Sequence, residues 1–206
     1  MIYVIDHQDS FTFNLVHLLS SFDKVYVNNY FEINKKKLST ADLIVLSPGP
    51  GEPKDYPVTS KIYKSFKGKK KILGICLGFQ LLFTESEEFN QNKGLGIIEG
   101  SVKSLSRKLN SVPVPHVGWN TVINQKFLNQ QKFGPRSKIV LNDNDYYYFV
   151  HSYYVKPKNI ENIYTVTRYG QHEFCSSIKL DNVFGCQFHP EKSGPGGLNF
   201  LKNYFS

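Results

Sequence analysis

The chain has 206 residues, of which 40% are hydrophobic and 20% are charged. This composition is that of an ordinary globular protein, and it excludes a disordered chain, a collagen-like fibre and a small disulfide-stapled domain. The formal net charge is +8, but the lysines form only short, scattered clusters and no long basic stripe interleaved with aromatic residues. We therefore expect no nucleic-acid partner.

Nothing in the sequence predicts export or membrane insertion. No apolar run approaches the roughly 20 residues that span a bilayer, and no basic segment followed by a long apolar one opens the chain. The three cysteines, Cys76, Cys175 and Cys186, are an odd number, which favours a reducing compartment over a disulfide framework. We expect a cytoplasmic protein without a membrane partner. No linker-like or repeated segment interrupts the chain, so residues 1–206 are predicted to form one domain.

The first half alternates short apolar runs with stretches of helical spacing. Strands are predicted at residues 1–5, 25–27, 43–46 and 71–75. Helices are predicted at residues 11–19, 57–66 and 77–83. This alternation is typical of βαβ units around a mainly parallel sheet. Ligands of such sheets bind beyond the carboxyl ends of the strands, where a Pro/Gly loop at residues 47–51 and Cys76 would lie.

The second half is richer in strand signals. Strands are predicted at residues 101–105, 121–123, 146–150, 164–168, 176–180 and 183–188, with a turn at residues 142–145 and a closing helix at residues 198–205. The predicted fold class is therefore α/β, with a mainly parallel central sheet flanked by helices and extended by mixed or antiparallel strands.

A candidate nucleophile stands in the segment Gly74-Ile75-Cys76-Leu77-Gly78. A small residue on each side of a nucleophile, between a strand and a helix, is the pattern of a nucleophile elbow. The turn exposes the sulfur at a helix N-terminus, where backbone N–H groups favour a thiolate and can hold an oxyanion. A buried structural cysteine is the alternative, because that is the usual place of a free cysteine.

A candidate base and its orienting group occur in Gln187-Phe188-His189-Pro190-Glu191. Proline disfavours a helical backbone at His189, and an extended chain would point the side chains of His189 and Glu191 to the same side. Glu191 could then hold one ring nitrogen while the other faces Cys76. A surface histidine beside an unrelated acid is the alternative. The Pro/Gly loop at residues 47–51 could present N–H groups to an oxyanion, or be an ordinary turn.

Together these segments resemble the class I glutamine amidotransferase family, whose glutaminases use a Cys-His-Glu triad. The resemblance covers nearly the whole chain and implies a single-domain α/β fold. It implies that Cys76 is the nucleophile, His189 the acid and base, and Glu191 the orienting group. It also implies that backbone or side-chain contacts to L-glutamine come from Gly49, Pro50, Gly51, Leu77, Gln80, Ser152 and Tyr153. No metal or organic cofactor is expected.

The resemblance is mixed at the level of subfamily. Residues 5–15 and 47–53 resemble the small subunit of anthranilate or aminodeoxychorismate synthase. Residues 77–83, 115–120, 148–153 and 187–194 resemble the glutaminase subunit of imidazole glycerol phosphate synthase. The segment Pro115-His116-Val117-Gly118-Trp119-Asn120 discriminates best and favours the second type. The implied partner is then a (β/α)8-barrel cyclase of histidine biosynthesis in a heterodimer. The alternatives are a chorismate-utilising subunit of tryptophan or folate biosynthesis, or another ammonia-using synthase.

The sequence alone leaves several alternative residue roles and functions open. His116 and His151 are candidates for structural roles or for lining an ammonia exit, and Trp119 is a candidate for the core. A metal site built from Cys175, Cys186 and His189 has no accepted ligand spacing. Rival functions are a binding protein without turnover and a cysteine hydrolase on the same fold. Cys76, Gln80, His189 and Glu191 together argue against the first, and Gln80 has no use in the second.

Overall fold

A computed structural model describes residues 1–66, 68–87, 92–106, 112–124, 141 and 145–205. Five parallel strands form its centre in the order β2-β1-β3-β4-β14. They are β1 (Ile2–Asp6), β2 (Val25–Asn29), β3 (Leu43–Leu46), β4 (Lys71–Ile75) and β14 (Val183–Cys186). Every residue of β3 is buried, as expected of a strand covered on both faces. Each such aliphatic side chain contributes about 1.5–3 kcal/mol on burial.

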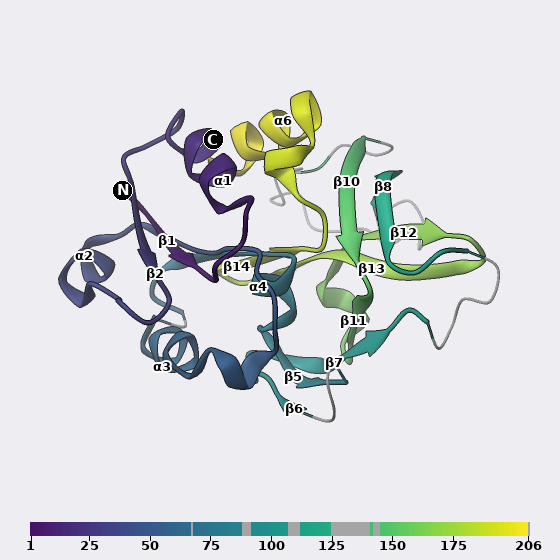
Figure 1. Cartoon of the computed structure of the whole chain (residues 1–206), viewed down its shortest axis with the longest axis horizontal. Coiled ribbons are helices and arrows are strands. Elements are labelled where there is room, and N and C mark those ends of the chain that lie inside the picture. Colours follow the sequence, from purple (N-terminus) through teal and green to yellow (C-terminus); the bar gives the residue numbers. More distant parts are fainter. Residues whose placement is uncertain (67, 88–91, 107–111, 125–140, 142–144, 206) are drawn as a thin grey trace.

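Helices cover both faces of the parallel strands (Figure 1). They are α1 (Thr12–Leu19), α2 (Lys35–Thr40), α3 (Pro57–Phe66) and α6 (Gly194–Phe205). Val4 and Val45 share one core cluster with Leu15 of α1. The neighbouring Ile5 and Ile44 belong to the opposite cluster, which Leu38 of α2 completes. The alternation follows from the two-residue period of a strand, which sends successive side chains to opposite faces.

Antiparallel strands extend this sheet beyond β14. They are β13 (His172–Leu180), β12 (Ile163–Tyr169), β11 (Tyr153–Pro157), β9 (Ile123–Asn124), β7 (Ile98–Ser104), β6 (Asn92–Lys93) and β5 (Phe83–Ser86), of which β5 and β7 run parallel to each other. A separate antiparallel pair consists of β8 (His116–Thr121) and β10 (Tyr146–His151). Short helices in the described part of the chain are α4 (Leu77–Gln80) and the 3-10 turns Pro53–Asp55, Ile160–Asn162 and Pro190–Lys192. The predicted fold class is confirmed.

The predicted element bounds were wrong in several places. The helix after Cys76 ends at Gln80 rather than residue 83, because Phe83 already pairs with Ile98 in the sheet. The closing helix begins at Gly194, since packing overrides the poor helix propensity of its first residues. The strand predicted at residues 121–123 is split between β8 and β9. The sequence did not predict α2, β5, β6 or β11, nor β8 before Thr121. Positions 142–144 of the predicted turn lie outside the described residues.

Within the described ranges, no helix combines the length and apolar character that crossing a membrane requires.

Candidate active site

Cys76 occupies a strained turn at the carboxyl end of β4. Its backbone has φ 51° and ψ −107°, a left-handed value that non-glycine residues rarely adopt. Its N–H donates to the carbonyl of Cys186 on the neighbouring strand, at 2.8 Å. Strain of this kind persists only where the surrounding structure enforces it, and it clusters at functional sites. The elbow geometry predicted for this segment is therefore present. Because α4 has a single turn, its amides rather than a long helix dipole would act on an anion.

The glycines of the elbow are needed for close backbone approach. A Cβ on Gly78 would lie 2.2 Å from the carbonyl oxygen of Leu46 in β3. A Cβ on Gly74 would lie 2.7 Å from the carbonyl oxygen of Gly78. Neither oxygen can rotate away, because both belong to the backbone. The two glycines thus let the turn fold back against β3.

We expect Gly78→Ala to lower the free energy of unfolding by about 3 kcal/mol or more, because backbone must move to admit the methyl group. Gly68→Ala is the matched control, since a Cβ there meets no atom within 4 Å and the cost is only that of φ 73°. The control should lose about 1 kcal/mol. Urea unfolding of both variants measures the difference, and equal losses would contradict this account of the elbow.

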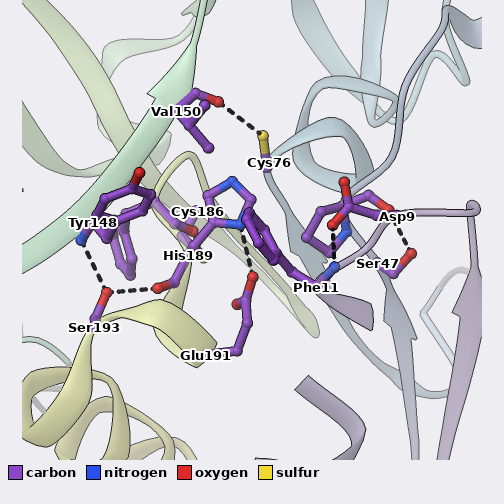
Figure 2. A network of polar contacts seen from close by, with 12 residues as sticks. Asp9, Phe11, Ser47, Cys76, Tyr148, Val150, Cys186, His189, Glu191 and Ser193 are labelled. Atoms are coloured by element: carbon purple, nitrogen blue, oxygen red, sulfur yellow. Dashed lines mark hydrogen bonds and ion pairs between the residues drawn. The ribbon is translucent and has the colours of Figure 1, made fainter. Parts of the chain in front are cut away.

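His189 and Glu191 form a buried ion pair beside the sulfur. The backbone of His189 is extended, with φ −104° and ψ 95°, as the following proline predicts. Its Nδ1 lies 2.7 Å from Oε1 of Glu191. A carboxylate only accepts, so Nδ1 carries the proton. Among the described residues, Nε2 has no hydrogen-bond partner. Figure 2 shows this nitrogen on the side of the ring that faces the sulfur of Cys76.

The charge state of His189 follows from its neighbours. Burial alone would lower the pKa of the imidazole, but the facing Cys76 sulfur and the Glu191 carboxylate together raise that pKa to about 10. Phe11 packs edge-on against the ring, with 5.7 Å between ring centroids, and shields this pair. The arrangement favours an imidazolium beside the Cys76 sulfur. Such a pair can attack a carbonyl and then donate a proton to the leaving group.

A cavity of about 420 Å³ opens at Cys76. Its lining comprises Gly49, Pro50, Gly51, Cys76, Leu77, Gln80, Pro115, Val150, His151, Ser152 and Tyr153. All seven residues that the resemblance assigns to glutamine binding are in this set. Gly51 has φ 85°, and a Cβ there would lie 2.6 Å from Oδ2 of Asp55, so the loop after β3 requires glycine. His189 and Glu191 are not among the residues that line the cavity, although the His189 ring faces the Cys76 sulfur (Figure 2).

The structure adds residues that sequence reasoning missed. Pro115 and Val150 line the cavity, and the carbonyl of Val150 accepts a hydrogen bond from the Cys76 thiol at 3.9 Å (Figure 2). Gln187 lies behind the sulfur, with Nε2 3.7 Å from Sγ. The position of Gln187 two residues before His189 could have indicated from the sequence that it lies near the site. A contact made by a backbone carbonyl, such as that of Val150, leaves no signal in the sequence. Trp119, a candidate for the core from the sequence, is 54% exposed and is not a core residue.

His116 and His151 form a hydrogen-bonded chain of neutral rings at the edge of the cavity. Nδ1 of His151 donates to the carbonyl of Tyr153 at 2.7 Å, which leaves its Nε2 as an acceptor for Nδ1–H of His116 at 3.1 Å. Nε2 of His116 then accepts from the side-chain amide of Asn120, at 3.3 Å. Burial lowers the pKa of His116 to about 4, and burial with the neighbouring His116 lowers that of His151 to about 3.

These depressed pKa values predict acid sensitivity. Between about pH 6.5 and pH 4 the unfolded chain binds protons that the folded histidines exclude, so the free energy of unfolding falls as the pH falls. The loss is on the order of 1–3 kcal/mol per histidine. His116→Gln should flatten this part of the profile of urea unfolding against pH. The exposed His17→Gln is the matched control and should leave it unchanged; an equally steep profile in His116→Gln would contradict the assignment.

The metal-site alternative finds no support in the arrangement of side chains. Sγ of Cys175 points to the carbonyl of Ser177, and Sγ of Cys186 points to that of Phe188. Within the part of the chain that the structure describes, no group of three or more His, Cys, Asp or Glu side chains could hold a metal ion.

Comparison with known proteins places this site in a family. The family model for glutamine amidotransferase class-I matches residues 3–206. The chain belongs to the class I glutamine amidotransferases. The family predicted from the sequence is thereby confirmed.

Two relatives are similar to this amidotransferase over most of its length. The imidazole glycerol phosphate synthase subunit HisH of Methanocaldococcus jannaschii is 40% identical over 209 residues, which cover 99% of this chain and 98% of that protein. The subunit of the same name from Pyrococcus furiosus is 40% identical over 188 residues, which cover 88% of this chain and 90% of that protein. The resemblance of the segments after Cys76 to the glutaminase subunit of imidazole glycerol phosphate synthase is therefore supported over nearly the whole chain.

Solved structures agree on the fold. A glutamine amidotransferase from Thermotoga maritima superposes with a TM-score of 0.61 at 17% identity, over 98% of this chain and 79% of that one. The glutaminase domain of Trypanosoma brucei CTPS, solved with bound acivicin, gives a TM-score of 0.63 at 14% identity, over 98% and 92% of the two chains. At these identities the likeness concerns the fold alone.

Proposed function

We propose that this amidotransferase is the glutaminase subunit of an imidazole glycerol phosphate synthase, acting in histidine biosynthesis in the cytoplasm as one domain over residues 1–206. It hydrolyses L-glutamine and delivers the ammonia to a synthase partner. The observation that carries the proposal is that Cys76, whose sulfur faces His189 and its partner Glu191, lines a cavity together with all seven candidate glutamine-binding residues. The two HisH relatives support the choice of pathway.

The proposed reaction starts with attack of the Cys76 thiolate on the carbon of the substrate's side-chain amide. Backbone N–H groups at Gly51 and Leu77 stabilise the oxyanion that forms. His189 donates its Nε2 proton to the leaving nitrogen, so ammonia departs and a glutamyl thioester remains. The neutral imidazole then takes a proton from water as the hydroxyl attacks the thioester. Glutamate leaves, and the thiolate–imidazolium pair is restored.

Glu191 acts on this sequence through the histidine. It holds Nδ1–H, which keeps Nε2 directed to the sulfur and stabilises the imidazolium. Gly49 supports the binding loop, because its Cα packs so closely that a Cβ would lie 2.8 Å from Leu77. Gln80, Ser152 and Tyr153 line the same cavity and position the glutamine. The reaction draws on side chains and backbone amides and needs no cofactor.

An exposed apolar surface beside the cavity supports a protein partner. Val117, Trp119 and Tyr146, on β8 and β10, are 54%, 54% and 62% exposed. The same two strands carry His116 and His151, and His151 lines the cavity. Exposed aromatic residues next to a site mark binding surfaces. A synthase subunit docked here, which we take to be a (β/α)8-barrel cyclase in a heterodimer, would meet the ammonia close to where it forms.

Co-purification from the native cell, followed by assay of the complex, tests this function. We expect a barrel synthase in the complex, glutamate release that rises when it is added, and glutamine-dependent formation of imidazole glycerol phosphate. Trp119→Ala should weaken the association by at least about tenfold, as expected of an aromatic anchor. Recovery of a chorismate-utilising subunit would instead support the resemblance of residues 5–15 and 47–53 and would overturn the choice of pathway.

A further inference from the structure

Gln187 is a fully buried polar residue that directly contacts the sulfur of Cys76. It lies between β14 and His189, and its backbone N–H donates to the carbonyl of Ser176 at 2.9 Å. Its side-chain Nε2 lies 3.7 Å from Sγ of Cys76. None of the proposed steps of glutamine hydrolysis uses the side chain of Gln187.

The orientation of the Gln187 amide is determined by its partner on the other side. Oε1 of Gln187 accepts a hydrogen bond from Nε2 of Gln80, at 3.1 Å. With the amide reversed, two donor groups would face each other at Gln80, and an oxygen would face the sulfur. Only the observed orientation satisfies both ends, so Nε2 is the atom presented to Cys76.

Gln80 is itself held in place, which makes the arrangement rigid. Its Nε2 donates a second hydrogen bond to the carbonyl of Tyr153, at 3.2 Å. The same carbonyl accepts from Nδ1 of His151, at 2.7 Å. A continuous set of hydrogen bonds thus runs from the histidine chain through Gln80 to Gln187, and it ends at the sulfur.

The neighbours of the sulfur have opposite effects on its charge. The carbonyl of Val150 can only accept, so it favours the protonated thiol. The side-chain N–H of Gln187 can only donate, so it favours the ionised sulfur. Once the thiol proton is gone, the contact with Val150 becomes repulsive, and donors must compensate.

We propose that Gln187 is a further residue of the catalytic machinery, which donates a hydrogen bond from Nε2 to the Cys76 sulfur and so favours the attacking thiolate. Gln80 is the positioning residue that aims this amide. The inference rests on the proposed role of Cys76 as nucleophile. It deepens that role by adding a fixed donor that remains when His189 gives up its proton.

The test measures ionisation of Cys76 without glutamine, as the rate of alkylation by iodoacetamide against pH, because the thiolate is the reacting form. In Gln187→Met the midpoint of this profile should rise by about one pH unit, so that alkylation near neutral pH slows by about tenfold. The plateau at high pH, where the sulfur is fully ionised, should match the parent chain. Gln187→Glu should shift the midpoint further, because a carboxylate cannot donate.

Controls separate this role from a structural one. The exposed Gln171→Met should leave the profile unchanged, and Cys76→Ala gives the background from Cys175 and Cys186. An unshifted midpoint in folded Gln187→Met, or a changed plateau alone, would overturn the proposal. If neither Gln187 variant folds, the side-chain amide signals of Gln187 in the parent decide: they should move with pH together with alkylation of Cys76, and signals that do not move refute the donor role. Normal ionisation of Cys76 together with no glutamate release by the synthase complex would instead contradict the proposed function.

Discussion

Replacement of Cys76 by alanine is expected to lower glutamine hydrolysis by at least about 10⁴-fold, while the synthase complex still uses added ammonium. Among the described residues that line the cavity, Cys76 is the one that carries a sulfur. Cys175 and Cys186 cannot take its place, because both are buried, and burial raises the pKa of each thiol. Glutamate release and ammonium-dependent product formation, measured on the same complex, check the prediction.

The control for this variant is Cys175→Ala, which removes a buried thiol outside the cavity. It should retain hydrolysis once the fold is shown to be intact. Residual glutaminase activity in Cys76→Ala above that of the solution reaction would mean that another group attacks the amide. Loss of ammonium-dependent turnover would mean that the substitution disturbs the complex rather than the chemistry.

Glu191→Gln is expected to lower glutamine hydrolysis by about 10³-fold or more and to move the alkaline limb of its pH profile to lower pH. The carboxylate is one of the two groups that keep the pKa of His189 near 10 against the effect of burial. Without it, the imidazolium loses its proton at lower pH, and less of the enzyme can protonate the leaving nitrogen. The amide can also turn its NH₂ group to Nδ1, which would leave the ring proton on Nε2 beside the sulfur.

The matched control is Glu173→Gln, which changes an exposed glutamate 3.5 Å from Arg168. Its rate and pH profile should equal those of the parent chain, because an exposed ion pair contributes little. An unchanged alkaline limb in Glu191→Gln would show that Glu191 does not control the charge of His189. The pH dependence of glutamate release from the synthase complex measures this limb.

The local geometry of the site could be predicted from sequence wherever a residue type is needed for a single physical reason. Gly74 and Gly78, on either side of Cys76, indicate close backbone contacts. In the structure Gly74 lies against the backbone of Gly78, and Gly78 lies against the backbone of Leu46. The proline after His189 predicts the extended backbone that directs the ring to Glu191. Such constraints act within a few residues, so no knowledge of the tertiary structure is needed.

What the sequence did not predict depends on contacts between distant segments. The amide of Gln187 acquires its orientation from Gln80, which lies 107 positions away. Strand β11 contains a proline and a lysine and was missed, because pairing with β7 rather than intrinsic propensity decides its structure. Helix α2 begins with three lysines and buries only Leu38, so its apolar signal is weak.

The most direct test of the central claim is to trap the covalent intermediate. The complex is mixed with glutamine and quenched in acid within the first turnovers, and its mass is measured before and after digestion into peptides. The account predicts a mass increase of one glutamyl group, located on the peptide that contains Cys76 and removed by hydroxylamine, as expected of a thioester. A glutamyl group on any other residue would contradict the proposal that Cys76 attacks glutamine. The absence of a glutamyl group from both the parent complex and the slower Glu191→Gln complex would contradict it as well.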